Sequence, residues 1–414
     1  MHWRSSSTRK ERDDGTPHWR PVSLIQVDVD TLTSTAPLHV EPGDELWIEA
    51  VKQGQVVGVI DARADSDGVP ASVLHELVTA FKDASISFHE PLPDAKLARA
   101  SVVVPTICRN PAELVRTVTS LLDLDYPDFE IIVVDNRPGV GSDPLPELPG
   151  SQQVRVFAEP KRGVSAARNL GIAMSTGDFV AFTDDDAVVD TGWLRALGTR
   201  FALDADVEGI GGLVLPMELM TAPQLWFEEF YGGFSPSFRA EKLSIERLKG
   251  IDKMFPYAVG RFGAGCNMAY RRSALERIGG FDTNIGGGTP AKGGEDVGIG
   301  INLVVMGGTF AYEPAAVVRH THRRTEDEFM SQVFNYGTGL TAMYTAMIVR
   351  DPRHLLAMIR RIPIGLRYLT RSPEQRSPRS APSYPKRTLI HQVLGMAYGP
   401  LAYLRSVVWR RWFD

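Results

Sequence analysis

The chain has 414 residues, of which 43% are hydrophobic, an ordinary share for a globular protein with a buried core. Its formal net charge is −5, so the bulk charge gives no support to nucleic-acid binding. The two cysteines, Cys108 and Cys266, are too few for a disulfide framework or a four-ligand zinc site, and they favour a reducing cytoplasm. No uninterrupted apolar run reaches roughly 18 residues, so we expect no membrane span.

The N-terminal hundred residues contain two segments of different composition. Residues 1–20 are polar and lack the apolar core of a secretory signal, and we expect them to be disordered. Residues 21–98 contain "VSLIQVDV" and "ELWIEAVKQGQVVGVIDA", which predict short strands joined by turns, and then "PASVLHELVTAF", which predicts a helix. We therefore predict a small β-rich accessory domain. Its sequence contains no cluster of residues that indicates a catalytic or binding site.

Residues 99–325 alternate between apolar strands and helices. The strands are expected in "SVVVPT", "EIIVVDN", "VRVFAE" and "FVAFTDDD", with helices in "NPAELVRTVTSLLDL" and "GVSAARNLGIAMSTG". This order predicts an α/β fold with a mostly parallel sheet covered on both faces. Ligands bind beyond the carboxyl ends of such strands, where this chain carries "PT" at 105–106, "DN" at 135–136 and "DDD" at 184–186. We expect these residues along one edge of the sheet.

The three adjacent aspartates directly follow a strand that we expect to be buried. Partly buried carboxylates are costly unless a positive partner is near. Carboxylate oxygens suit Mg²⁺ or Mn²⁺, which complete their shells with water and substrate phosphates. The alternative is a solvated acidic loop. A calcium EF-hand fits poorly, because its ligand alternation and central glycine are missing.

Two further segments carry candidate chemistry. In "GGEDVG", Glu295 and Asp296 open a helix after a glycine-rich loop, where a carboxylate can act as a general base or simply cap the helix. In "VRHTHRR", His320 and His322 would share one face of a strand, and one of them could join the aspartates as a nitrogen ligand. Both could instead be surface histidines. Neither a P-loop nor a GxGxxG follows the first strand of this region, which argues against ATP hydrolysis and dinucleotide binding.

The C-terminal region, residues 326–414, is basic. From residue 350 onward it holds 13 Lys or Arg and 3 Asp or Glu, a balance of +10, so the rest of the chain carries −15. The same stretch contains "HLLAMIRRIPIGLRYL" and "LIHQVLGMAYGPLAYLRSVVWRRWF". A basic, amphipathic, aromatic-rich end favours contact with an anionic membrane surface. The alternative is a helical region that packs on the core and keeps its arginines in solvent.

Taken in order, the motifs resemble those of family 2 glycosyltransferases of the GT-A fold. The resemblance rests on "SVVVPT" and "EIIVVDN", then "RGVSAARNLGIAMSTGDFVAFTDDDAVVDTGWL", "GAGCNMAYRRSALERIGGFD", "GGEDVGIG" and "VVRHTHRR", and it covers residues 101–324. It implies a Rossmann-like, mostly parallel sheet. It also implies an inverting transferase that uses a nucleotide-diphosphate sugar and a divalent metal, Mn²⁺ or Mg²⁺.

The resemblance assigns expected roles on the donor side of the site. Pro105 and Thr106 would border the nucleotide, and Asp135 would contact the base. Arg168 would support the donor, and the glycine loop that ends at Gly265 would lie beside the sugar.

The resemblance also assigns the metal and the base. The family's DxD motif falls on Asp184, Asp185 and Asp186, with Asp186 as the first metal ligand and Asp184 close to the ribose or sugar. The metal-binding histidine is His320 or His322. The family's ED pair falls on Glu295 and Asp296, with Asp296 as the base.

The sequence therefore predicts transfer of a sugar to an acceptor hydroxyl. The alternatives are a non-catalytic nucleotide-sugar-binding member of the fold, or a nucleotidyltransferase, which would need a glycine-rich loop after Val104 that we do not find. A glycan, a lipid-linked molecule or a small molecule can be the acceptor, and nucleic acid is not expected. We expect a cytoplasmic protein, at the inner face of the membrane if the basic tail binds lipid.

Overall fold

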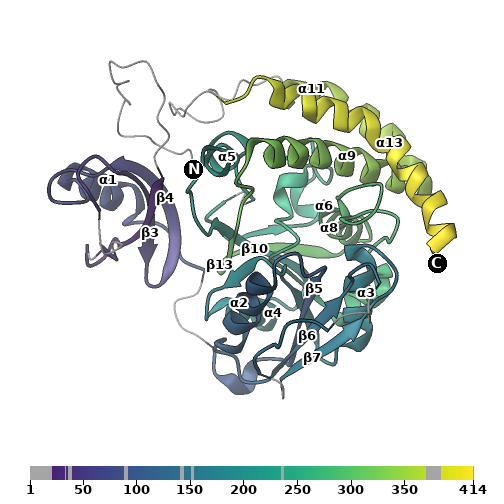
Figure 1. The fold of residues 1–414 in the computed structure, drawn as a ribbon, viewed down its shortest axis with the longest axis horizontal. Helices are drawn as coiled ribbons and strands as arrows, with labels where there is room; N and C mark the ends of the chain where they lie inside the picture. Colours follow the sequence, from purple (N-terminus) through teal and green to yellow (C-terminus); the bar gives the residue numbers. More distant parts are fainter. Residues whose placement is uncertain are drawn as a thin grey trace.

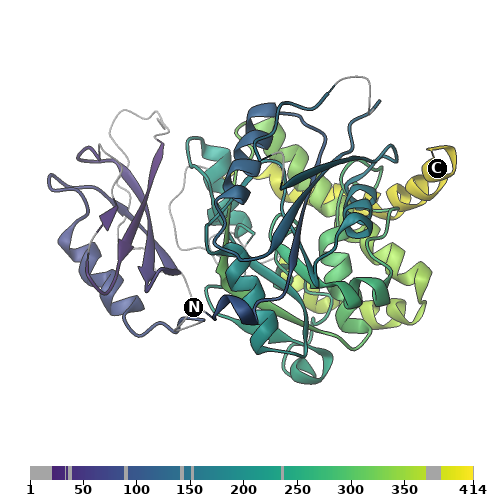
Figure 2. The ribbon, with the colours of Figure 1, turned by 90° about the horizontal axis from the view of Figure 1, so that it is seen from below.

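The computed structural model describes residues 21–32, 34–35, 40–87, 92–139, 144–150, 153–234, 237–369 and 384–413. The disorder predicted for residues 1–20 lies outside these described residues. The described part contains two β-sheets, one of four strands and one of nine. They belong to a small N-terminal unit and a large unit that lie side by side (Figures 1 and 2).

The small unit is built on the four-stranded sheet, in the order β2-β1-β3-β4. The strands are β1 (Val22–Asp28), β2 (Ser34–Thr35), β3 (Glu45–Lys52) and β4 (Gln55–Arg63), and helix α1 (Ala71–Phe81) follows them. Apolar residues of the strands, such as Ile48 and Ile60, pack with Leu77 of α1 in a core of their own. The predicted boundary near residue 98 stays a prediction.

The large sheet has the order β11-β13-β10-β12-β8-β5-β6-β7, and β9 pairs with β13. Its strands are β5 (Ala100–Thr106), β6 (Phe129–Asp135), β7 (Val154–Ala158), β8 (Phe179–Phe182), β9 (Ala187–Val189), β10 (Val207–Pro216), β11 (Glu241–Leu243), β12 (Met268–Arg271) and β13 (Thr309–His320). The pairings give β5, β6, β7, β8, β10 and β13 the same direction. The sheet is therefore mostly parallel, and β12 runs against its neighbours.

Helices cover both faces of the large sheet because its strands bury both sets of side chains. Val102 and Val104 of β5 face one core, which includes α2 (Pro111–Leu122) and α4 (Trp193–Leu203). Val103 faces the opposite core, formed with α3 (Val164–Met174), α7 (Arg272–Ile278) and α8 (Glu295–Val305). Successive residues of a strand point to opposite faces, so a continuous apolar run fills both cores. Shorter elements complete the unit: η1 (Asp94–Lys96), α5 (Ala222–Trp226), η2 (Phe227–Tyr231), α6 (Ile245–Leu248) and η3 (Val259–Arg261).

The C-terminal region is helical. It comprises α9 (Glu326–Arg350), α10 (Arg353–Ile359), α11 (Ile362–Leu369) and α13 (Arg387–Phe413). Helix α9 begins at a capping box in which Thr325 and Glu328 bond each other's backbone N–H groups. Helix α13 packs along α9 on the outside of the molecule (Figure 1). In the part of the chain that the structure describes, no helix has the length and apolar character needed to cross a membrane.

The small unit is joined to the large sheet by a buried ion pair. The carboxylate of Glu49, on β3, is 1% exposed and accepts hydrogen bonds of 2.9 and 2.7 Å from the guanidinium of Arg319, on β13. A backbone bridge between Val22 and Leu219 adds to this contact. The small unit thus holds β13 one residue before His320.

The predicted fold class is confirmed. The molecule is an α/β protein with a mostly parallel central sheet, a small β-rich N-terminal unit and a helical C-terminal region. Helix α13 packs on α9, as the alternative for the tail expects, but Arg410 is buried and not in solvent. Contact of the tail with a membrane stays a prediction.

Candidate active site

The polar residues at the carboxyl ends of β5, β6 and β8 lie along one edge of the sheet. The register sets Thr106 opposite Asp135, and Val103 opposite Phe182, so the aspartates that follow β8 emerge beside Thr106. A cavity of about 360 Å³ opens at this edge. Its lining includes most of the residues singled out from the sequence: Pro105, Thr106, Arg168, Asp184, Asp185, Asp186, Glu295 and His320.

Each of the three aspartates has a different partner. The guanidinium of Arg168 donates to Asp184 over 3.1 Å. The hydroxyl of Thr106 donates to Asp185. Nε2 of His320 lies 3.1 Å from Oδ1 of Asp186. These partners explain how the chain tolerates three adjacent carboxylates at the end of a buried strand.

The three carboxyl groups consequently titrate differently. Burial raises the pKa of Asp184, and Arg168 opposes this effect. Burial, with the charges of Asp186 and Asp184, raises the pKa of Asp185 to about 6 despite its bond from Thr106. Burial also disfavours ionisation of Asp186, but His320 outweighs it and lowers the pKa of Asp186 to about 2. Asp186 is thus an anion at neutral pH, as a ligand of a hard cation must be.

Arg168 connects the aspartates to the second acidic pair. It lies on α3, its side chain is 2% exposed, and its Nη1 donates to Oε1 of Glu295 over 2.9 Å. Its Nη2 also lies 3.3 Å from the carbonyl oxygen of Gly265. Burial disfavours a charged guanidinium, yet Asp184 and Glu295 raise the pKa of Arg168, so it stays a cation. One buried charge thereby fixes carboxylates that are far apart in the sequence.

Glu295 and Asp296 stand at the N-terminus of α8, after Gly294 in the left-handed conformation. Burial and the charge of Asp296 raise the pKa of Glu295 to about 7, against the effect of Arg168. The carboxylate of Asp296 is half-buried and accepts the N–H of Gly265 over 2.9 Å and that of Val297 over 2.8 Å. A side chain at Gly265 would meet Arg168 at 2.7 Å, so this close approach needs glycine.

The two histidines have separate surroundings. His320 ends β13, beside Asp186. His322 lies beyond the strand, is 3% exposed, and its Nε2 is 2.5 Å from Oε1 of Glu228. Its ring packs against Phe227, with ring centroids 4.7 Å apart. The structure therefore places His320 beside the aspartates, whereas His322 pairs with Glu228 on η2.

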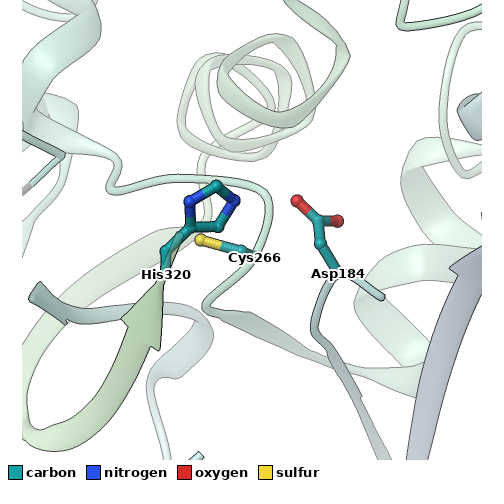
Figure 3. Close-up of side chains that lie close together, drawn as sticks. All are labelled: Asp184, Cys266 and His320. Carbon is teal, nitrogen blue, oxygen red and sulfur yellow. The ribbon is translucent and has the colours of Figure 1, made fainter. Parts of the chain in front are cut away.

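The donors beside His320 suit a divalent cation. Asp184, Cys266 and His320 offer ligand atoms within 4.8 Å of one another, the one such group among the described residues (Figure 3). Nδ1 of His320 is buried and finds no hydrogen-bond partner in the described structure. The carboxylate and imidazole of this group, with the carboxylate of Asp186 3.1 Å from Nε2 of His320, fit Mn²⁺ or Mg²⁺, whereas the thiol is a softer ligand than these ions prefer. An orphaned buried nitrogen is the kind of atom that a ligand or ion satisfies.

Sequence reasoning missed Cys266 in this group. The thiol is 2% exposed, and burial together with the charges of Asp184 and Asp186 raises its pKa well above the ordinary value. Its position next to Gly265 of the glycine loop was the available sign. A single cysteine among apolar neighbours is usually an inert core residue, which made that sign weak.

Asp135 is the predicted residue whose carboxylate turns to another partner. It is bound by the guanidinium of Arg137, with distances of 2.7 to 3.1 Å, and it is absent from the cavity lining. Its neighbour Asn136 lines the cavity instead, and it cross-links the carbonyls of Glu159 and Lys161 to the N–H of Gly163. The predicted contact of Asp135 with the base stays a prediction.

The arginines at and after the end of β13 also differ in their partners. Arg319 is paired with Glu49, and Arg324 with Glu218 at 2.7 Å. Arg323 lines the cavity together with Arg109, which follows β5. Two guanidinium groups at the rim give the cavity positive charge beside its aspartates, the combination that suits an anionic ligand bound with a cation.

Comparison with known proteins agrees with this geometry. Residues 101–279 match the family model described as "Glycosyl transferase family 2". This segment is similar to glycosyl transferase family 2. The resemblance inferred from the motifs is therefore confirmed.

Curated relatives extend the likeness. The chain is 28% identical over 265 residues to the pre-mycofactocin glycosyltransferase of Mycobacterium tuberculosis, covering 63% of this chain and 51% of the relative. It is 28% identical over 191 residues to the glucosyl-dolichyl phosphate glucuronosyltransferase of Haloferax volcanii, covering 45% and 57% respectively. The chain thus spans about half the length of the curated relatives it matches.

A solved structure is also similar. It is a mannosyltransferase from Pyrobaculum calidifontis in complex with GDP-Man and Mn²⁺, with 17% sequence identity and a TM-score of 0.45. The match covers 82% of this chain and 94% of that one.

Proposed function

We propose that the protein is an inverting, metal-dependent glycosyltransferase that moves a sugar from a nucleotide-diphosphate donor to an acceptor hydroxyl. One observation carries the proposal. Arg168 and Gly265 tie the Asp184 side of the cavity to the acidic pair Glu295 and Asp296, of which Glu295 lines the cavity. Asp296 and Gly265 do not line it, but the N–H of Gly265 holds the carboxylate of Asp296 next to this lining.

Asp296 is the proposed base. Its two carboxylate oxygens are held by the N–H groups of Gly265 and Val297, which fix its orientation. The acceptor's O–H proton passes to this carboxylate as the acceptor oxygen bonds to the anomeric carbon. The bond from that carbon to the donor's diphosphate breaks on the opposite face, and the electron pair leaves with the diphosphate. The configuration inverts, and no covalent sugar–enzyme intermediate forms.

Glu295 supports the base rather than replacing it. It is buried against Arg168, and its raised pKa, about 7, makes it a poor permanent anion. We assign it to holding Arg168 in place beside the donor.

The donor is held at the sheet edge. Asp186, Asp184 and His320 would bind the divalent cation, and His322 is left out because it is paired with Glu228. When bound, Mn²⁺ or Mg²⁺ would neutralise the diphosphate and make it a better leaving group. Arg109 and Arg323 at the rim are suited to the same phosphates. Pro105 and Thr106, with Asp185, would border the nucleotide, and Asp135, with Asn136 beside it in the cavity lining, would contact the base.

The acceptor can be a glycan, a lipid-linked molecule or a small molecule. We also propose a cytoplasmic site of action, with which the two free thiols, Cys108 and Cys266, are compatible. A non-catalytic nucleotide-sugar-binding protein is the second candidate, because the same cavity could bind a donor without transferring its sugar.

The first experiment is calorimetric titration of UDP, GDP and dTDP, with and without Mn²⁺, into the wild type and Asp186→Asn. We expect one nucleotide to bind in a metal-dependent way and the variant to lose that binding. Asp190→Asn is the matched control, because this neighbouring acid lies near Arg319 and outside the cavity. Failure of all three nucleotides to bind would contradict the proposal, and binding without any donor turnover would favour the non-catalytic candidate.

A further inference from the structure

The outward face of α13 is apolar. Seven large apolar side chains between Leu389 and Val408 are each 48% to 60% exposed. At 100° per residue they fall on one side of the helix, and Ala397 and Pro400 on the same side are also exposed. A surface helix of a globular protein normally turns its apolar side to the core, so α13 is reversed.

The inner face of α13 explains the reversal. Small residues, among them Gly395 and Gly399, form its close contact with α9. A Cβ at Gly395 would lie 2.1 Å from the carbonyl oxygen of Phe334, and one at Gly399 would lie 2.5 Å from that of Thr338. The two helices therefore meet backbone to backbone, and the large apolar side chains have no room between them.

The charges on α13 itself all have one sign, although Arg387 forms an ion pair with Glu326 of α9. No aspartate or glutamate occurs in α13, and the cations Lys386, Arg387, Arg405 and Arg411 are exposed at its two ends. The pattern of an exposed apolar stripe with cations at both ends is that of a helix lying in the interface of an anionic bilayer. A second copy of the chain fits less well, because two such faces would bring like charges together.

We infer that the outer face of α13 docks on an anionic lipid surface, with the helix lying in the plane of the membrane. The apolar stripe enters the boundary between headgroups and acyl chains, and the basic ends meet the anionic headgroups. Docking of this kind does not depend on the proposed transferase activity, since it uses none of the cavity residues.

The docked helix lies close to the proposed active site. Helix α13 packs on α9, and Gly339 and Met343 of α9 pack against Gly294, the residue before Glu295. Arg410, near the end of α13, is 5% exposed and donates to the carbonyl oxygen of Thr283 over 2.8 Å. Docking would therefore hold the catalytic unit at the surface, within two layers of helix of the cavity.

The test is co-sedimentation of the full chain with vesicles. Vesicles of phosphatidylglycerol and phosphatidylcholine are compared with vesicles of phosphatidylcholine alone. The stripe variant carries Leu394→Gln and Leu401→Gln, at positions that are 56% and 54% exposed. The matched control carries Leu203→Gln and Ile251→Gln, at positions that are 57% and 78% exposed on other elements. Thermal melts of both variants check that the chain stays folded.

We expect the wild type and the control to bind the anionic vesicles, and the stripe variant to bind at least about tenfold more weakly. Binding should also weaken with added salt, because salt screens the attraction of the basic ends. Failure of the wild type to bind, or equal binding by the stripe variant, would overturn the inference. Sedimentation velocity supplies a further contrary outcome: a dimer that only the stripe variant loses would make this face a self-interface. Calorimetry with nucleotide on the same samples tests the cavity separately.

Discussion

The carboxyl edge of the large sheet and the outer face of α13 place opposite kinds of group in unfavourable surroundings. At the sheet edge, charged groups are partly buried, and each one has a partner: Asp186 has His320, and Asp184 has Arg168. On α13, seven large apolar side chains are exposed on one side of the helix, whereas a protein surface normally exposes such residues singly. Burial of charge and exposure of apolar surface both cost free energy, so both mark places where a ligand or a surface completes the structure.

The difference between them lies in how each can be tested. A substitution at the sheet edge should alter both the free energy of unfolding and the catalytic activity, because the charged groups there stabilise one another. A substitution on the outer face of α13 should barely change the stability of the isolated protein, because no described part of the chain packs against this face.

The largest expected effect is on catalysis at Asp296. Asp296→Asn keeps the size of the side chain but removes the base, so sugar transfer should fall about 10²- to 10⁴-fold. Nucleotide binding measured by calorimetry should change little, because the cation-binding residues are intact. The measurement is the initial rate of donor consumption, with Asp190→Asn as the control. Full transfer by Asp296→Asn would remove this residue from the proposed mechanism.

Arg168 should give the largest effect on stability. Arg168→Gln leaves Glu295, which is 8% exposed, without its buried partner, and we expect a loss of about 3 to 5 kcal/mol. Urea unfolding measures it. The control is Arg195→Gln, whose partners Asp94 and Asp125 are 65% and 71% exposed, and which should cost less than about 1 kcal/mol. Equal costs would show that the active-site cluster is not held together by this cation.

Glu130 extends the comparison to a buried carboxylate outside the cavity. Burial opposes its ionisation, but bonds from Thr176, Ser101 and Arg155 lower its pKa to about 2, from an ordinary 4.5. The ionised form therefore stabilises the fold above pH 4.5, and this contribution is lost as the pH falls from 4.5 toward 2.

Glu130→Gln should cost about 2 kcal/mol at neutral pH and flatten the acid loss of stability in that range. Thermal melts from neutral to acid pH measure both effects. Glu241→Gln, which removes a surface pair with Arg261, is the control and should leave the acid profile unchanged. An unaltered acid profile in Glu130→Gln would assign the acid sensitivity to other carboxylates.

Much of this arrangement follows from local sequence. Apolar runs such as residues 129–135 and 179–182 predict buried parallel strands, and the carboxyl edge of such a sheet predicts where the aspartates meet. The capping residue Asn110 predicts the start of α2, where its side chain accepts the N–H of Ala112. These features depend on neighbours in the chain.

The remaining features depend on residues far away in the chain. His320 and His322 cannot be told apart by strand periodicity, because the difference is made by Glu228, 94 residues before His322. The pairing of Arg319 depends on Glu49, 270 residues away. The orientation of α13 is likewise set by the backbone of α9 and not by its own amphipathic pattern.

The two faces of α13 can be separated by adjacent substitutions. Gly395→Ala would put a methyl group 2.1 Å from the carbonyl oxygen of Phe334, so the helices must move apart. We expect a loss of about 1 to 3 kcal/mol, despite the better helix propensity of alanine. Gly365→Ala, where the nearest atom to the new Cβ is 3.9 Å away, is the control and should be neutral or slightly stabilising. A neutral Gly395→Ala would mean that α13 does not need its close contact with α9.

The smallest effect is expected one residue earlier. Leu394→Gln changes a side chain that is 56% exposed, and the free energy of unfolding should shift by no more than about 0.5 kcal/mol. Leu303→Gln in α8, where the leucine is fully buried, should cost several times as much, at least about 2 kcal/mol. The near-zero result is informative because the same residue is expected to matter for vesicle binding. A loss above about 1 kcal/mol at Leu394 would mean that another part of the chain already covers the outer face of α13. No exposed apolar surface would then be left for a membrane to bind.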